Sequence, residues 1–138
     1  VKSNCRNINE PKNLLDYDSD NFYATYNIQP DACITFDFKD KLIEISKYSI
    51  KSTLHDSNKG QIKNWVIEIS SDGKQWTKID EHSNYSGLNE RGAIKTFNVQ
   101  PNQFSRFFRF RHTGEYWGPN WALKFNSIEI FGKLKTIF

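Results

Sequence analysis

The chain has 138 residues, 15% of them aromatic, which fits one domain with a single core and favours strands over helices. The net charge is +3 with basic and acidic residues interleaved, so no basic stripe marks a nucleic-acid partner. No apolar run approaches the roughly 20 residues that cross a bilayer, so we expect no transmembrane segment.

The start of the chain indicates a piece of a longer polypeptide. The sequence has no Met and does not open with the apolar core of a signal peptide. We expect residues 1–138 to be a single excised domain with its core at about 14–132. The two cysteines, Cys5 and Cys33, are too few for a disulfide framework, and either a bridge between them or two free thiols fits. Free thiols suit a reducing compartment, so we expect an intracellular location, cytoplasmic or cytoskeletal, rather than secretion.

Residues 1–31 are rich in Asn, Asp and Ser and are predicted to form loops. Three aspartates alternate there, and hard oxygen ligands at that spacing suit Ca²⁺. The following Gly and the distal Glu of an EF-hand loop are missing, so the segment is not that motif. The alternative is a solvated acidic loop whose side chains cap turns. The three residues are Asp16, Asp18 and Asp20.

From residue 32 onward, apolar and polar residues alternate with the period of two that is typical of half-buried strands. Asp72-Gly73 predicts a hairpin turn, because glycine tolerates positive φ. Trp65 and Trp76, on either side of this turn, are expected in the core rather than on a sugar-binding platform. The predicted strands include Ile34–Phe38, Leu42–Ile50, Trp65–Ser70, Ile94–Val99, Phe107–Arg111 and Ile128–Gly132.

No helix-period segment exceeds one turn, so the pattern predicts an all-β sandwich or jelly roll of about eight mainly antiparallel strands. The hairpin Trp65–Trp76, the Arg-rich segment Phe107–Gly114 and the final Ile128–Gly132 follow one another in a specific order. Together they resemble the discoidin, or coagulation-factor C-type, domain of the galactose-binding-like jelly rolls. The likeness covers residues 14–132 and is closer to the intracellular domains of protists and of some BTB-containing proteins than to secreted mammalian ones.

The resemblance implies a binding module that presents loops at one end of the sandwich to glycans, lipid head groups or proteins. Secreted members join the first and last strands with a disulfide, but no cysteine lies near Gly132. Sugar-binding relatives often hold a structural Ca²⁺ between an early loop and a glutamate of the last strand. Here that glutamate would be Glu129, although the early loop does not match their motif closely.

Candidate ligand residues lie in three loops. In the segment 114–121, aromatic rings among turn formers must either pack back as a plug or meet a partner. The loops 54–62 and 82–92 are polar, and their side chains can hydrogen-bond hydroxyls or peptide groups, although most such loops are simply solvated. The residues singled out are Tyr116, Trp117, Trp121, His55, Asn89 and Arg91.

Two arginines, Arg109 and Arg111, alternate with phenylalanines and therefore share the polar face of their strand. Their guanidinium groups can hold carboxylate, phosphate or sulfated ligands in bidentate fashion. The alternative is pairing with a carboxylate of a neighbouring strand. The acidic residues available for this are Glu44, Glu68 and Glu129.

Catalytic signatures are missing from the sequence, and a spatial triad such as that of Asp80, His82 and Ser86 is left open. We therefore expect no enzyme and no cofactor apart from the Ca²⁺ considered above. The predicted function is a non-catalytic recognition module that binds a protein partner through loops at one end of the sandwich. Glycan binding is the first alternative, and a structural role in a large cytoskeletal assembly is the second.

Overall fold

A computed structural model of the chain describes residues 2–3, 15, 23–24, 32–52, 62–114 and 124–136. The described residues form strands and turns without an α-helix, and therefore include no helix long and apolar enough to cross a membrane. The strands are β1 Lys2–Ser3, β2 Tyr23–Ala24, β3 Cys33–Asp37, β4 Lys41–Lys51, β5 Trp65–Ser70, β6 Thr77–His82, β7 Ile94–Asn98, β8 Phe107–His112, β9 Lys124–Phe125 and β10 Ser127–Thr136.

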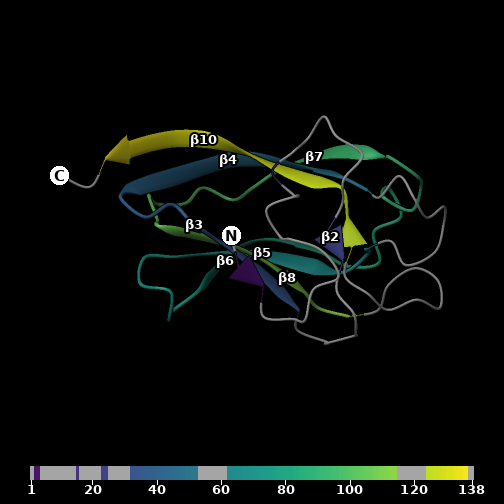
Figure 1. The fold of residues 1–138 in the computed structure, drawn as a ribbon, viewed down its shortest axis with the longest axis horizontal. Coiled ribbons are helices and arrows are strands. Elements are labelled where there is room, and N and C mark those ends of the chain that lie inside the picture. The colour runs from purple at the N-terminus through teal and green to yellow at the C-terminus, as the bar shows by residue number, and fades with distance from the viewer. Residues whose placement is uncertain are drawn as a thin grey trace.

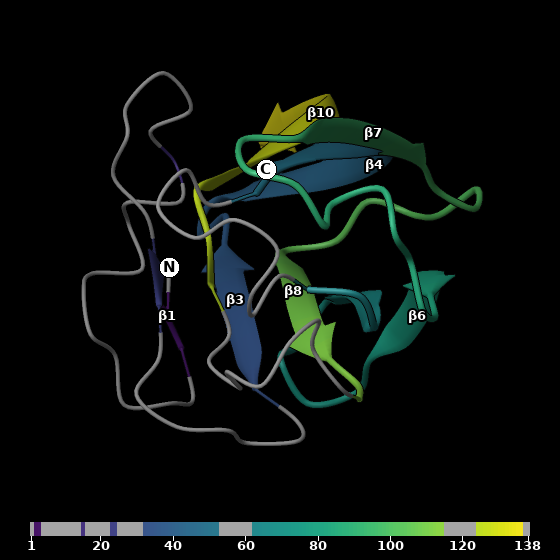
Figure 2. The same ribbon diagram turned by 90° about the vertical axis from the view of Figure 1, so that its right-hand side faces the viewer.

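Two antiparallel sheets face each other, as Figure 2 shows, with β4, β7 and β10 in one layer and β3, β6 and β8 in the other. The larger sheet has the order β1-β3-β8-β5-β6 and the smaller one the order β10-β4-β7, while β2 and β9 form a separate pair. The predicted all-β jelly-roll sandwich is confirmed.

The core between the layers is built from the alternating residues that the pattern predicted. Phe108 and Phe110 of β8 are fully buried, as are Trp65 and Ile67 of β5. Strand β5 differs from a half-buried strand, because all six of its residues are buried. At its outward-facing Glu68, the burial comes from arginine side chains of β8, which cover the carboxylate.

Trp76 does not lie in the core, so that expectation was wrong. The residue is half-buried, and the guanidinium of Arg109 stacks over its ring, 3.9 Å from the centroid. The ring also meets Phe107 edge-on, with centroids 6.3 Å apart. Its place just after the turn at Gly73, whose φ is 76°, puts it on the outer face of the larger sheet.

The last strand continues beyond the predicted end at Gly132. Strand β10 pairs with β4 up to Thr136, with a register shift between Phe131 and Gly132. This irregularity lets the strand continue along β4 after the apolar pattern in its own sequence has stopped.

The connections separate into two ends. At the loop end, 83–93 joins β6 of the larger sheet to β7 of the smaller one, and the stretches 53–61 and 113–123 begin there, after β4 and β8. At the turn end, 38–40 and 99–106 join strands of the two layers, and 71–76 joins β5 to β6 within the larger sheet. Figure 1 shows the turn end on the left, where β10 finishes.

Candidate ligand-binding end of the sandwich

The loop end is where the sequence placed most of its candidate ligand residues. The strand register explains why the segments 83–93 and 113–123 start close together. Trp65 pairs with both His82 and His112, the last residues of β6 and β8. Of the candidates there, Asn89 and Arg91 belong to the described segment 83–93. The others, Tyr116, Trp117, Trp121 and His55, lie outside the described residues.

The segment 83–93 has a fixed shape because its second half is tied to the end of β4. The backbone N–H of Ser52 donates to the carbonyl of Ala93, and the N–H of Ala93 donates to Oγ of Ser52, both at 2.9 Å. Oγ of Ser52 also donates to the carbonyl of Glu90. Leu88 is fully buried beneath the segment. Such anchoring lowers the entropy that a ligand would otherwise have to remove.

Asn89 carries an unsatisfied acceptor at this end. Its side-chain oxygen is buried and accepts no hydrogen bond from the residues that the structure describes, while its backbone N–H donates to the carbonyl of Ser86. The neighbouring Glu90 and Arg91 are exposed. A buried acceptor without a donor costs about 1–3 kcal/mol.

Asn64 connects two of the three segments of the loop end. Its Oδ1 accepts from the backbone N–H of Asn84 at 2.8 Å, and its carbonyl accepts from the N–H of Thr113 at 3.2 Å. Gly114 packs against the same side chain, where an added Cβ would lie 3.2 Å from Nδ2. Asn64 therefore sets the position of 83–93 relative to the start of 113–123.

We expect Asn64→Ala to free the N–H of Asn84 and to speed amide hydrogen exchange in 83–93. The effect on the free energy of unfolding should be small, about 1 kcal/mol, because one hydrogen bond at the surface is lost. Asn64→Asp keeps the accepting oxygen and is the matched control. Unchanged exchange in both variants would show that Asn64 does not position the segment.

The floor of the loop end is a polar network between the two layers. Nε1 of Trp65 donates to the hydroxyl of Tyr48 at 2.9 Å, and that hydroxyl donates to Oδ2 of Asp80 at 2.5 Å. Nε2 of His82 hydrogen-bonds to the same Oδ2 at 2.9 Å. Burial raises the pKa of Asp80, but the hydrogen bonds from His82 and Tyr48 outweigh it and lower the pKa overall. Burial and the contact with Asp80 raise the pKa of Tyr48.

The imidazole of the Asp80–His82 pair lies in the packing between the layers. The imidazole of His82 packs among aromatic rings, with centroids 4.8 Å from Trp65 and 4.5 Å from Phe97. Within the described part of the chain no hydrogen bond joins it to Ser86. The geometry therefore assigns the pair to holding the layers together.

Arg109 and Arg111 lie on the outer face of the larger sheet, where both bind one carboxylate. Their Nε atoms donate to Oε1 of Glu68 at 3.1 and 2.9 Å. Burial raises the pKa of Glu68, but the hydrogen bonds from Arg111 and Arg109 outweigh it, and the pKa is lowered. Of the carboxylates considered from the sequence, the structure thus pairs Glu68 with both arginines.

Glu129 lies on β10 and lines a hollow of about 420 Å³ together with Leu15, the residue before Asp16. Asp16, Asp18 and Asp20 themselves lie outside the described residues. Among the residues that are described, no group of three or more His, Cys, Asp or Glu side chains could hold a metal ion. The Ca²⁺ site stays a prediction.

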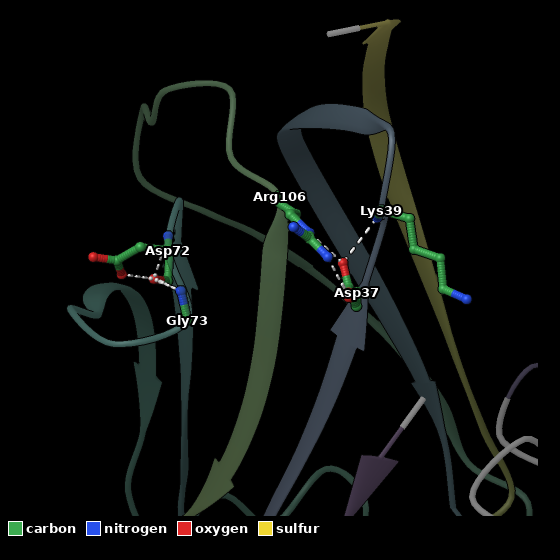
Figure 3. Close-up of polar contacts among 6 residues, drawn as sticks. Asp37, Lys39, Asp72, Gly73 and Arg106 are labelled. Atoms are coloured by element: carbon green, nitrogen blue, oxygen red, sulfur yellow. Dashed lines mark hydrogen bonds and ion pairs between the residues drawn. The ribbon is translucent and has the colours of Figure 1, made fainter.

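The turn end carries a separate ion pair, drawn in Figure 3. Nε and Nη2 of Arg106 donate to the two carboxylate oxygens of Asp37 at 2.7 and 3.0 Å. The N–H of Lys39 also donates to this carboxylate. These contacts, led by the bond from Arg106, lower the pKa of Asp37 from 3.8 to about 2.

A lowered pKa makes the Asp37 contribution to stability acid-sensitive. It is present above about pH 4 and disappears as the pH falls toward 2, because the unfolded chain then binds the proton more readily. We expect Asp37→Asn to cost under about 1 kcal/mol at pH 7, since both partners are partly exposed. Most of the difference should be lost near pH 2. Urea unfolding at both pH values tests this, and an equal difference at both would contradict it.

Comparison with known proteins identifies the family to which the chain belongs. A sequence model of the F5/8 type C domain matches residues 2–126. The E3 ubiquitin-protein ligase hecd-1 of Caenorhabditis elegans is 26% identical over 144 residues, which cover 99% of this chain and 5% of that protein. The chain therefore spans a small part of that relative.

Solved structures with the same fold include carbohydrate-binding modules. CBM32-3 from a family 31 glycoside hydrolase of Clostridium perfringens has a TM-score of 0.73 at 18% identity, covering 96% of this chain and 89% of that one. The family 32 module of C. perfringens NanJ, solved with galactose, has a TM-score of 0.72 at 12% identity, covering 97% and 91%. These structures share the fold of this chain, and the match of the family model over residues 2–126 shows that the chain belongs to the F5/8 type C, or discoidin, domain family.

Proposed function

We propose that this domain is a recognition module whose loop end binds another protein. The observation that carries the proposal is the anchored segment 83–93, which presents the exposed and oppositely charged side chains of Glu90 and Arg91. Protein surfaces offer peptide N–H donors and charges of both signs, which complement this set. The C. elegans relative is a ubiquitin-protein ligase, which supports a protein as the partner.

Crosslinking from a single position tests the proposal. A photoreactive amino acid placed at Arg91 in the chain, expressed in its own cells, should yield a discrete crosslinked protein. The same group at Lys133, an exposed residue of β10 toward the turn end, is the control and should not. Arg91→Glu should weaken capture of that protein about tenfold or more, as expected for an interfacial charge reversal. Equal crosslinking from both positions would contradict a binding site at the loop end.

Glycan binding is the second candidate, favoured by the exposed side chains of Glu90 and Arg91, which can hydrogen-bond sugar hydroxyls. The NanJ module, solved in complex with galactose, supports this alternative. A glycan array that gives a clear signal with the wild type and none with Arg91→Ala would favour it. Capture of the crosslinked protein that resists millimolar free galactose would favour the protein partner instead.

A further inference from the structure

A groove of about 470 Å³ lies at the turn end, on the side of the molecule remote from the segment 83–93. One wall is the hairpin turn 71–76 with the start of β6, and the other is the segment 99–106. Ile69 and Ile79 form an apolar floor and are 6% and 2% exposed. The volume falls within the roughly 300–1,000 Å³ of typical ligand sites.

The wall formed by 99–106 is fixed to both sheets. The N–H of Gln100 donates to the carbonyl of Ile79 at 3.0 Å, which ties the segment to β6. Nδ2 of Asn102 donates to the carbonyl of Ile45 at 2.8 Å, and its Oδ1 accepts from the N–H of the same residue. Ser105 and Ile43 exchange two backbone hydrogen bonds of 2.9 Å. This wall therefore needs little ordering before a ligand binds.

The opposite wall is held by the turn itself. Oδ1 of Asp72 accepts from the N–H groups of Lys74 and Gln75 at 2.8 and 2.9 Å. Oγ of Ser70 accepts from the N–H of Gly73 at 2.8 Å. Figure 3 shows Asp72 and Gly73 in this turn, across the sheet from the Asp37–Arg106 pair. Both walls are thus preformed.

Unpaired amide side chains line both walls. Gln75, Gln100 and Gln103 are exposed, and their side chains make no hydrogen bond within the described part of the chain. The hydroxyl of Thr77 lies in the same lining and is likewise exposed. Each primary amide offers a donor and an acceptor side by side, the same pair that a backbone peptide group presents.

The charges of the groove are already matched, which favours an uncharged ligand. Its charged lining residues are Asp72, engaged by the backbone of its own turn, and Lys78, which pairs with Glu81 at 3.4 Å. A charged ligand would lose hydration without gaining a free counter-charge. None of the described residues that line the groove carries an aromatic ring on which a sugar could stack. Trp76 is turned away, onto Arg109.

We propose that this groove is a second binding site, which takes an extended, uncharged stretch of polypeptide. The backbone peptide groups of that stretch pair with the side chains of Gln75, Gln100 and Gln103, while small side chains rest on Ile69 and Ile79. The site is independent of the loop end, since it shares no residue with the segment 83–93.

The test uses the blocked hexapeptide acetyl-(Ser-Ala)₃-amide as probe and NMR chemical shifts of the ¹⁵N-labelled chain as readout. With the peptide at about 10 mM, a concentration suited to weak binding, we expect shifts in residues 69–79 and 100–105. The double variant Gln100→Ala/Gln103→Ala should weaken binding about fivefold or more, because two hydrogen-bonding groups are removed at the surface. Lys95→Ala, an exposed change on β7, and Arg91→Glu at the loop end should leave it unchanged.

Three results would overturn the proposal. The first is the absence of shifts in these two segments at that peptide concentration. The second is binding that the double variant does not weaken. The third is cellotriose giving the same shifts while the peptide gives none, which would make the groove a glycan site. Arg91→Glu changes the loop end and leaves the residues that line the groove unchanged. The groove proposal can therefore fail independently of the loop-end proposal.

Discussion

Trp65→Ala is expected to lower the free energy of unfolding by about 3–5 kcal/mol, the usual cost of truncating a buried Trp or Phe. The indole is fully buried, and its ring stacks on Phe110 with centroids 6.0 Å apart. Its Nε1 supplies the hydrogen bond that the hydroxyl of Tyr48 accepts. The substitution therefore opens a cavity and removes one donor from the network between the layers. Urea unfolding followed by circular dichroism measures the loss.

The chain supplies its own control at Trp76. That ring lies on the outer face and contributes mainly its stack with Arg109, so Trp76→Ala should cost about 1 kcal/mol. Trp65→Phe separates packing from hydrogen bonding, because it keeps most of the ring and loses the donor. A cost at Trp76 equal to that at Trp65 would mean that the two rings do not have the different environments described.

Gly132→Ala is expected to cost about 2–3 kcal/mol, toward the upper end for an overpacked position. An added Cβ would lie 2.1 Å from the carbonyl oxygen of Glu44 and 3.0 Å from Cα of Ile45. Both are backbone atoms of β4, so no flexible side chain can move aside. Relief requires a shift of the irregular pairing between Phe131 and Gly132, which would disturb the rest of β10.

The neighbouring Lys133→Ala is the matched control for this strand. Lys133 is exposed, and its replacement should stay within about 0.5 kcal/mol. Thermal unfolding of the two variants side by side gives the comparison. If Gly132→Ala were as mild as Lys133→Ala, the close approach of β4 and β10 at this point would be wrong.

Alternation in the sequence was sufficient to predict the strands that face the core, because burial of one face imposes the period of two directly. It failed at β5, since Glu68 is covered by side chains from a neighbouring strand, and no local pattern records that. It failed at Trp76 because a residue just after a turn does not have to follow the alternation of the strand. The continuation of β10 depends on pairing with β4, which is also non-local.

The candidate site was predictable in outline. A polar, glycine-containing stretch between two predicted strands indicated a loop at 82–92, which is the observed segment 83–93 to within one residue. Asn89 and Arg91 were identified within it. Asn64 was missed, because its role comes from accepting backbone N–H groups far away in the sequence. A lone asparagine before a strand gives no sign of that. The groove at the turn end was missed for a similar reason: its walls meet only after the two sheets have packed.

The link between Asn64 and Asn84 bears on how this domain can be re-engineered or can diverge. Asn84 has a φ of 55°, a left-handed conformation that asparagine tolerates better than most residues, and its N–H is received by Asn64. A foreign loop grafted between β6 and β7 would need to reproduce that conformation and find an acceptor at position 64. The transplantable unit is therefore the loop together with Asn64, and libraries that randomise 83–93 alone should keep Asn84 constant.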